Sequence, residues 1–250
     1  MDGLELTGYL AAIVIGLALG LVGGGGSILT VPVLVYLLGI NPVLSTAYSL
    51  FVVGLTSLVG AATYMRRHEV SYKTALILAF PSFISVFLTR KFILPSIPQE
   101  IFQIGNLHMS KSHFIMLLFA ILMALASLSM IRHHHVEPHK HHHPPSYSAI
   151  GVFGIGLGFL TGTVGAGGGF LIIPILVLLA KLQMKHAIGT SLLIIAINSL
   201  IGFTGDVMVQ QIDWQFLSIF SAMAVAGILT GSYLAGSIEA SKLRPAFGWF

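Results

Sequence analysis

Long apolar segments without a single charged residue are the feature that most restricts what this chain can fold into. The uncharged segments cover residues 44–64, 74–89, 114–131, 187–205 and 214–236. About 20 mostly apolar residues cross the hydrocarbon core of a bilayer as one helix. Transmembrane barrels instead use shorter segments that alternate apolar and polar residues, and that alternation is absent from this sequence. The sequence therefore predicts an all-α membrane protein.

The composition excludes several other classes of protein. Only 8% of the 250 residues are charged and the mean hydropathy is +0.94, whereas soluble domains carry about a quarter charged residues. The net charge of +4 is expected from basic cytoplasmic loops rather than from nucleic-acid binding. The absence of cysteine excludes disulfides and thiolate metal sites. The first five residues lack the features of a cleaved signal peptide, so the first apolar stretch is expected to remain as a membrane helix in contact with lipid.

The two halves of the chain repeat one pattern. When Pro32 is placed over Pro174, the halves align without a gap from residue 16 to about residue 73. In this alignment Gly16, Gly20, Gly23, Gly25 and Gly26 fall on Gly158, Gly162, Gly165, Gly167 and Gly168. Unrelated apolar helices share leucine and valine by chance, but not glycines in register. We therefore predict a first repeat at 1–131, a His/Pro-rich cytoplasmic linker at 132–146 and a second repeat at 147–250.

Each repeat is predicted to contain a glycine-rich hairpin of broken helix followed by three transmembrane helices. The helices expected in the first repeat cover about residues 7–22, 27–38, 44–64, 73–92 and 112–131. Those expected in the second cover about 147–164, 169–182, 186–208 and 214–238, with a last helix that starts near 243 and is truncated. By comparison with the first repeat, the natural chain is expected to be longer.

The distribution of lysine and arginine suggests that the repeats are inverted relative to each other. Short loops rich in these residues stay in the cytoplasm, which places Arg66, Arg67, Lys181 and Lys185 inside. The Asn41-Pro42 turn and the loop 206–213 carry no Lys or Arg and should lie outside. Inverted repeats are a common plan in secondary transporters. Three basic residues disagree, because Arg90, Lys91 and Lys111 would lie outside, and a parallel repeat remains the alternative.

The glycine clusters at 23–27 and 165–169 are the expected substrate site. Backbone without helical hydrogen bonds must be buried in protein or line a wet cavity, and the unpaired N–H groups at the start of the following helix attract anions. Polar side chains on the third predicted helix of each repeat are further candidate ligands. They include serines that match between the repeats and the side-chain amide of Asn198. The predicted substrate-binding residues are Gly23, Gly24, Gly25, Gly26, Ser27, Ser49, Ser57, Gly165, Gly167, Gly168, Gly169, Thr190, Ser191 and Asn198.

The predicted helix interiors contain no Arg, Lys, Asp, Glu or His, which favours an anion held by neutral donors over a divalent cation. The same absence argues against an enzyme, because catalysis needs a nucleophile, a metal or a paired acid and base. No cofactor is expected. Asp206, Glu69 and His68 near helix ends are interpreted as interfacial charges.

The linker contains a cluster of histidines: His133, His134, His135, His139, His141, His142 and His143. Clustered histidines can bind Zn²⁺ or Ni²⁺, so a divalent-metal permease that collects ions on this loop is the alternative function. The flanking prolines and the lack of periodicity favour a solvated tether with incidental metal affinity. Transport that survives deletion of 133–143 would argue against the metal permease.

The glycine-rich motifs at 20–32 and 162–174, together with Ala47-Tyr48-Ser49 and Gly189-Thr190-Ser191, resemble the sulfite exporter TauE/SafE family. The resemblance extends over nearly the whole chain. It implies a multi-pass permease of the prokaryotic inner membrane that exports sulfite, an organosulfonate or a related sulfur-containing anion. A homodimer is possible, and the histidine loop is not part of the family pattern.

Overall fold

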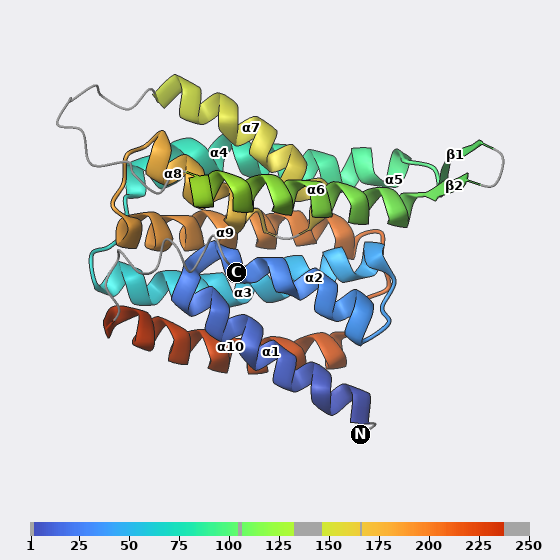
Figure 1. Ribbon diagram of the computed structural model, residues 1–250, viewed down its shortest axis with the longest axis horizontal. Coiled ribbons are helices and arrows are strands. Elements are labelled where there is room, and N and C mark those ends of the chain that lie inside the picture. Colours follow the sequence, from blue (N-terminus) through green and yellow to red (C-terminus); the bar gives the residue numbers. More distant parts are fainter. Residues whose placement is uncertain (1–2, 105–106, 133–146, 166, 238–250) are drawn as a thin grey trace.

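The structure is a computed structural model, and it describes residues 3–104, 107–132, 147–165 and 167–237. Within these ranges most helices run along the long axis of the molecule (Figure 1). In the first half the elements are α1 (Gly3–Val22), the 3₁₀ segment η1 (Gly23–Leu29), α2 (Thr30–Pro32), the π segment η2 (Val33–Leu37), α3 (Pro42–Arg66), α4 (Tyr72–Leu88), the π segment η3 (Thr89–Ile93), α5 (Leu94–Ser96), β1 (Glu100–Ile104), β2 (Leu107–Ser110) and α6 (Lys111–Arg132). The second half contains α7 (Tyr147–Val164), α8 (Gly169–Leu178), α9 (Met184–Val207) and α10 (Trp214–Ser237).

Four helical stretches of the described chain are long and apolar enough to cross a membrane: Pro42–Arg66, Tyr72–Ser96, Met184–Val207 and Trp214–Ala235. This confirms the prediction of a helical membrane protein. The start of the first span follows from its local sequence, since the Asn41 side chain accepts a hydrogen bond from the Val43 amide (2.9 Å) and Pro42 takes the first helical position. The helix expected from residue 243 lies outside the described residues.

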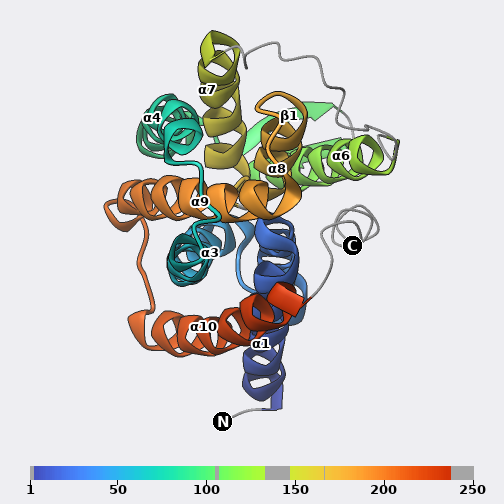
Figure 2. The same ribbon diagram turned by 90° about the vertical axis from the view of Figure 1, so that its left-hand side faces the viewer.

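Helix α9 lies in the middle of the molecule, with α4, α7 and α8 on one side of it and α3 on the other (Figure 2). Most of α3 and α9 is buried, whereas large apolar side chains of α4, α7 and α10 are exposed, among them Phe80, Phe153 and Tyr233. Exposed apolar side chains on the outer helices are what a hydrocarbon solvent requires. The two central helices are therefore the ones that can line a route through the protein.

The first helix of each glycine hairpin packs against a helix of the opposite half. Helix α1 packs on α10, and α7 packs on α4. The approach is close because glycines face backbone carbonyls: Gly16 lies directly against the Ala224 carbonyl, and Gly158 against that of Ser82. Gly16 and Gly158 are a matched pair of the sequence repeat, and small residues of this kind let membrane helices approach closely.

The ends of the bundle differ in charge. The loops after α3 and before α9 lie at one end, drawn at the left of Figure 1, which we call the basic end. Here Arg66, Arg67 and Lys181 are exposed. The opposite end carries the loop after α9 and an antiparallel pair of strands, β1 and β2, and we call it the hairpin end.

The strand pair is a departure from the sequence prediction, which placed no strand in the chain. The 100–110 segment lies between two helices and contains Phe102, Ile104 and Met109. The sequence prediction assigns it to no element. The structure also extends α4 beyond the predicted end at residue 92, through η3 and α5 to Ser96.

Candidate functional site

The two glycine clusters meet inside the protein. A side chain on Gly24 would overlap the backbone of Gly169, and one on Gly169 would overlap the backbone of Gly24. Both residues are buried. Gly23 and Gly165, the first residues of the two clusters, are 142 positions apart and match in the repeat. Their backbone torsions are nearly the same, with φ of 72° for Gly23 and 75° for Gly165. The structure thus brings the predicted site residues of the two halves together.

The second cluster forms a turn that leads into a helix. Gly165, Gly167 and Gly168 have φ of 75°, 66° and 69°, a region that favours glycine over residues with a Cβ. Helix α8 begins directly after them at Gly169. The first peptide N–H groups of this helix therefore start at the contact between the two clusters.

The first cluster differs from the prediction. A new helix was expected to begin at about Ser27, but the chain passes from α1 into the 3₁₀ segment Gly23–Leu29, which contains Gly25 and Gly26. Four consecutive glycines have little α-helical preference, and the tighter winding follows from that. The Ser27 hydroxyl, a predicted ligand, donates instead to the Gly24 carbonyl (2.6 Å) and stabilises the 3₁₀ segment.

Unpaired polar groups lie on the two central helices. The hydroxyls of Ser49, Ser57 and Ser199 are fully buried and have no hydrogen-bond partner. The Ser199 oxygen lies 3.0 Å from the point where a Cβ on Gly167 would be, so it adjoins the second glycine cluster. Buried hydroxyls are normally satisfied, which makes these three groups available to a polar guest.

Asn198, a predicted substrate ligand, is buried between α9 and α4. Its Nδ2 donates to the Ser82 hydroxyl (2.7 Å), and its Oδ1 has no partner. The Ser82 hydroxyl can equally donate to the amide oxygen, which would leave the amide N–H groups free to donate to a ligand. Asn198 therefore remains a candidate ligand.

Two predicted ligands have structural partners instead. The Ser191 hydroxyl donates to the Ile188 carbonyl one turn earlier in α9 (2.8 Å). The Thr190 hydroxyl accepts from the Ser71 amide at the start of α4 (2.9 Å). A hydroxyl in a membrane helix commonly bonds its own backbone, and Ser191 follows that rule. The matched pair Ser49 and Ser191 is thus unequal, whereas Ser57 and Ser199 are both unpaired.

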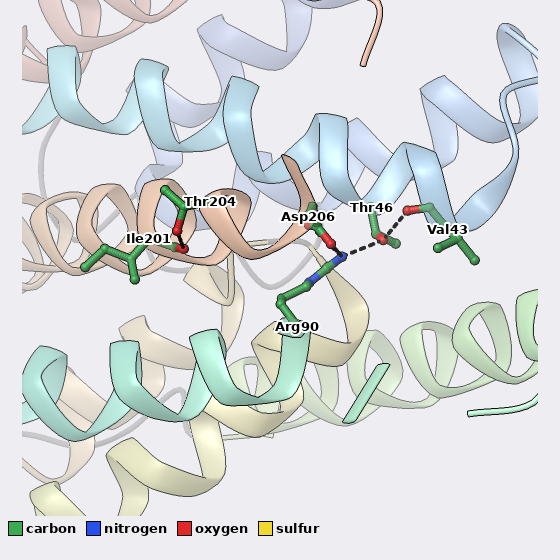
Figure 3. Close-up of polar contacts among 6 residues, drawn as sticks. All are labelled: Val43, Thr46, Arg90, Ile201, Thr204 and Asp206. Carbon is green, nitrogen blue, oxygen red and sulfur yellow. Dashed lines mark hydrogen bonds and ion pairs between the residues drawn. The ribbon is translucent and has the colours of Figure 1, made fainter. Parts of the chain in front are cut away.

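An ion pair inside the bundle overturns the expectation that the helix interiors carry no charge. Arg90 in η3 is 1% exposed, and its Nη1 donates to the Asp206 carboxylate (3.0 Å) and to the Thr46 hydroxyl (3.0 Å), as Figure 3 shows. Asp206 near the end of α9 is likewise buried, so it is not the interfacial charge predicted for it. His68 is exposed and Glu69 is partly buried.

Burial accounts for two of the three basic residues that disagreed with the predicted orientation. Arg90 is buried against Asp206, and Lys111 is buried with its Nζ on the Leu94 carbonyl (2.5 Å). Lys91 lies over the rings of Phe87 and Phe92. Arg90 and Lys111 are therefore not solvated cations of a short loop, the kind of residue that sets orientation, whereas Lys91 is exposed. The position of Arg90 on the side predicted to lie outside was the sequence signal that could have indicated its ion pair with Asp206.

The described residues contain no group of three or more His, Asp or Glu side chains that could hold a metal ion. The histidine cluster lies within 133–146, outside the described residues.

Comparison with known proteins decides the family. The sequence profile of the family described as "Sulfite exporter TauE/SafE" matches residues 9–250. The chain belongs to the TauE/SafE family. The resemblance of the glycine motifs is thereby confirmed, and the protein is a membrane transporter by family rather than an enzyme.

Relatives of the TauE/SafE protein come from bacteria and an archaeon. A "Probable membrane transporter protein" of Xylella fastidiosa is 31% identical over 94% of this chain and 87% of the relative. The "Probable membrane transporter protein YunE" of Bacillus subtilis is 27% identical over 92% and 88%. A third, MJ0441 of Methanocaldococcus jannaschii, is 26% identical over 76% and 69%. No solved structure matches the chain at a significant level.

Proposed function

We propose that the protein is a permease of the prokaryotic inner membrane that exports a small oxyanion, sulfite or an organosulfonate. The anion is held where the glycine clusters meet, by the N–H groups at the start of α8 and by hydroxyls of the central helices. The observation that carries this proposal is the buried, unpaired hydroxyl of Ser199 beside the Gly167 turn, together with two further unpaired hydroxyls, Ser49 and Ser57, on the facing central helix. Neutral donors and a helix N-terminus favour a negative guest and bind it weakly enough for release.

The direction of the helices supports two inverted repeats. In Figure 1, α3, α6 and α10 run from the hairpin end to the basic end, and α4 and α9 run the other way. Repeat-matched helices α3 and α9 therefore run in opposite directions, as do α4 and α10. With the exposed arginines and lysines in the cytoplasm, the basic end faces the cell interior and the hairpin end faces outward.

Flux from proteoliposomes tests the proposal directly. Vesicles that contain the purified protein should release sulfite or methanesulfonate faster than empty vesicles, and faster than they release Zn²⁺. Thiosulfate and sulfate complete the panel and define the preferred anion. Vesicles that release none of the four anions above background would exclude the proposed function, and release of Zn²⁺ alone would favour the metal permease.

Paired serine variants test the site itself. We expect Ser57→Ala and Ser199→Ala each to raise the KM for the transported anion, since one neutral hydrogen bond contributes about 0.5–1.5 kcal/mol, or about two- to ten-fold in affinity. Ser191→Ala is the matched control, because its hydroxyl is already bonded to its own helix. Equal KM values in all three variants would mean that the unpaired hydroxyls do not touch the anion.

A further inference from the structure

The guanidinium of the buried Arg90 has hydrogen-bond partners at one nitrogen and none at the other two. Its Nη1 donates to Asp206 and Thr46, but Nε and Nη2 have no partner. These two nitrogens carry parallel N–H groups on one edge of the guanidinium, the edge that binds two oxygens of one group at once. The free edge is inaccessible to solvent, so its two donors have no water shell of their own.

The free edge lies beside the second glycine cluster. Nη2 is 2.5 Å from the point where a Cβ on Gly165 would be. The same glycine lies against Thr46 of α3. The guanidinium is therefore next to the turn that leads to α8, at the side of the turn toward the hairpin end.

Positive charge is in excess in this region. In the part of the chain that the structure describes, the buried charged side chains are Arg90, Lys111 and Asp206. Lys111 bonds the carbonyl of Leu94, one helical turn beyond Arg90 on the same stretch of helix. The described residues thus bury two cations and one carboxylate, and an additional anion would balance the charge.

The fold does not require an ion pair at this corner. When the register of the repeats is continued beyond residue 73, Arg90 and Asp206 fall on Ser232 and Tyr64. These two residues are also buried, and neither is charged. A buried pair that packing does not demand is poor evidence for a purely stabilising role.

We propose that Arg90 binds the transported oxyanion through Nε and Nη2, against the Gly165 turn, while Asp206 serves as its resting counter-ion on the opposite edge. The ligand class is an anion with two oxygens on one atom, such as sulfite or a sulfonate. This inference rests on the proposed function and adds a charged ligand to a site otherwise made of neutral donors.

The first test measures thermal stability in detergent with sulfite or with chloride. Asp206→Asn leaves Arg90 without its carboxylate, so its Tm should fall in chloride and recover on addition of sulfite. The double variant Arg90→Gln/Asp206→Asn removes both charges, so its Tm should recover without sulfite and no longer respond to it. A double variant that sulfite stabilises as strongly as the wild type would overturn the inference.

The second test measures transport in proteoliposomes. We expect the double variant to lose about ten- to a hundred-fold in kcat/KM for sulfite, the usual effect of losing hydrogen bonds to a charged group. Arg90→Lys keeps the charge but loses the two-donor edge, and should fall between the double variant and the wild type. Lys91→Gln, which changes the exposed neighbouring cation, is the matched control and should transport normally.

The results separate this inference from the function on which it rests. Wild-type flux together with normal flux in the double variant would overturn the role of Arg90 and leave the permease intact. Absence of flux in the wild type, with stabilisation by sulfite that depends on Arg90, would overturn the permease and support the binding site. A wild type that neither transports sulfite nor responds to it would overturn both.

Discussion

Gly24→Ala is expected to abolish transport and to lower the stability of the protein. The new methyl group would overlap the backbone of Gly169, and neither backbone segment can yield as a flexible side chain would. Overpacking of this kind usually costs about 1–3 kcal/mol and occasionally more. The Tm in detergent and the flux of sulfite from proteoliposomes give the two readings.

Gly151→Ala is the matched control for this variant. Gly151 lies in α7, and nothing occupies the space within 4 Å of the position its Cβ would take. Alanine favours a helix by about 0.5–1 kcal/mol over glycine, so this variant should be as stable as the wild type or slightly more so. If Gly24→Ala matched Gly151→Ala in both Tm and flux, the contact between the two glycine clusters would be refuted.

Labelling of single cysteines is expected to give an all-or-none result for the orientation of the chain. The protein contains no cysteine, so each introduced thiol is the only target. Gln99→Cys, an exposed position between α5 and β1 at the hairpin end, should react with a membrane-impermeant maleimide added to intact cells. Arg67→Cys and Gln183→Cys, exposed at the basic end, should react only after the membrane is permeabilised.

The pair at 67 and 183 also distinguishes inverted from parallel repeats. In the repeat alignment Gln183 corresponds to Asn41, which is expected outside. Parallel repeats would therefore place Gln183 outside as well, while inverted repeats place it inside with Arg67. Labelling of Gln183→Cys in intact cells, with Arg67→Cys protected, would contradict the inverted arrangement.

Three helices of the second half could be predicted from the sequence to within two residues, whereas the helix expected at 169–182 ends at Leu178 and the one expected at 27–38 is divided into short segments. The expected helix at 147–164 has the bounds of α7, and those at 186–208 and 214–238 differ from α9 and α10 by two residues or fewer. This agreement has a physical cause. A lipid-facing segment must satisfy every backbone group within its own helix, so the local sequence largely decides where such a span lies.

The details of the site depend on contacts that the sequence does not encode locally. The 3₁₀ winding of η1 and the hydrogen bond of Ser191 to its own helix both remove groups that were expected to face a ligand. Arg90 and Asp206 are 116 positions apart in the sequence. A charged residue near the end of a predicted helix is interpreted as interfacial when its distant partner is not known. Only the packing of α4 against α9 shows that these charges are internal.

The uncharged residues at the repeat-matched positions Ser232 and Tyr64 have one more consequence. A transporter that alternates between two shapes by exchanging the conformations of its inverted halves would populate both shapes equally if the halves had the same sequence. Here only one half-site holds a salt bridge, with Arg90 and Asp206 where the other has Ser232 and Tyr64. If the halves exchange conformations in this way, the resting equilibrium would be biased toward the shape that preserves this bridge. An anion bound at the free edge of Arg90 would compete with Asp206 for its charge and shift the balance toward the other shape.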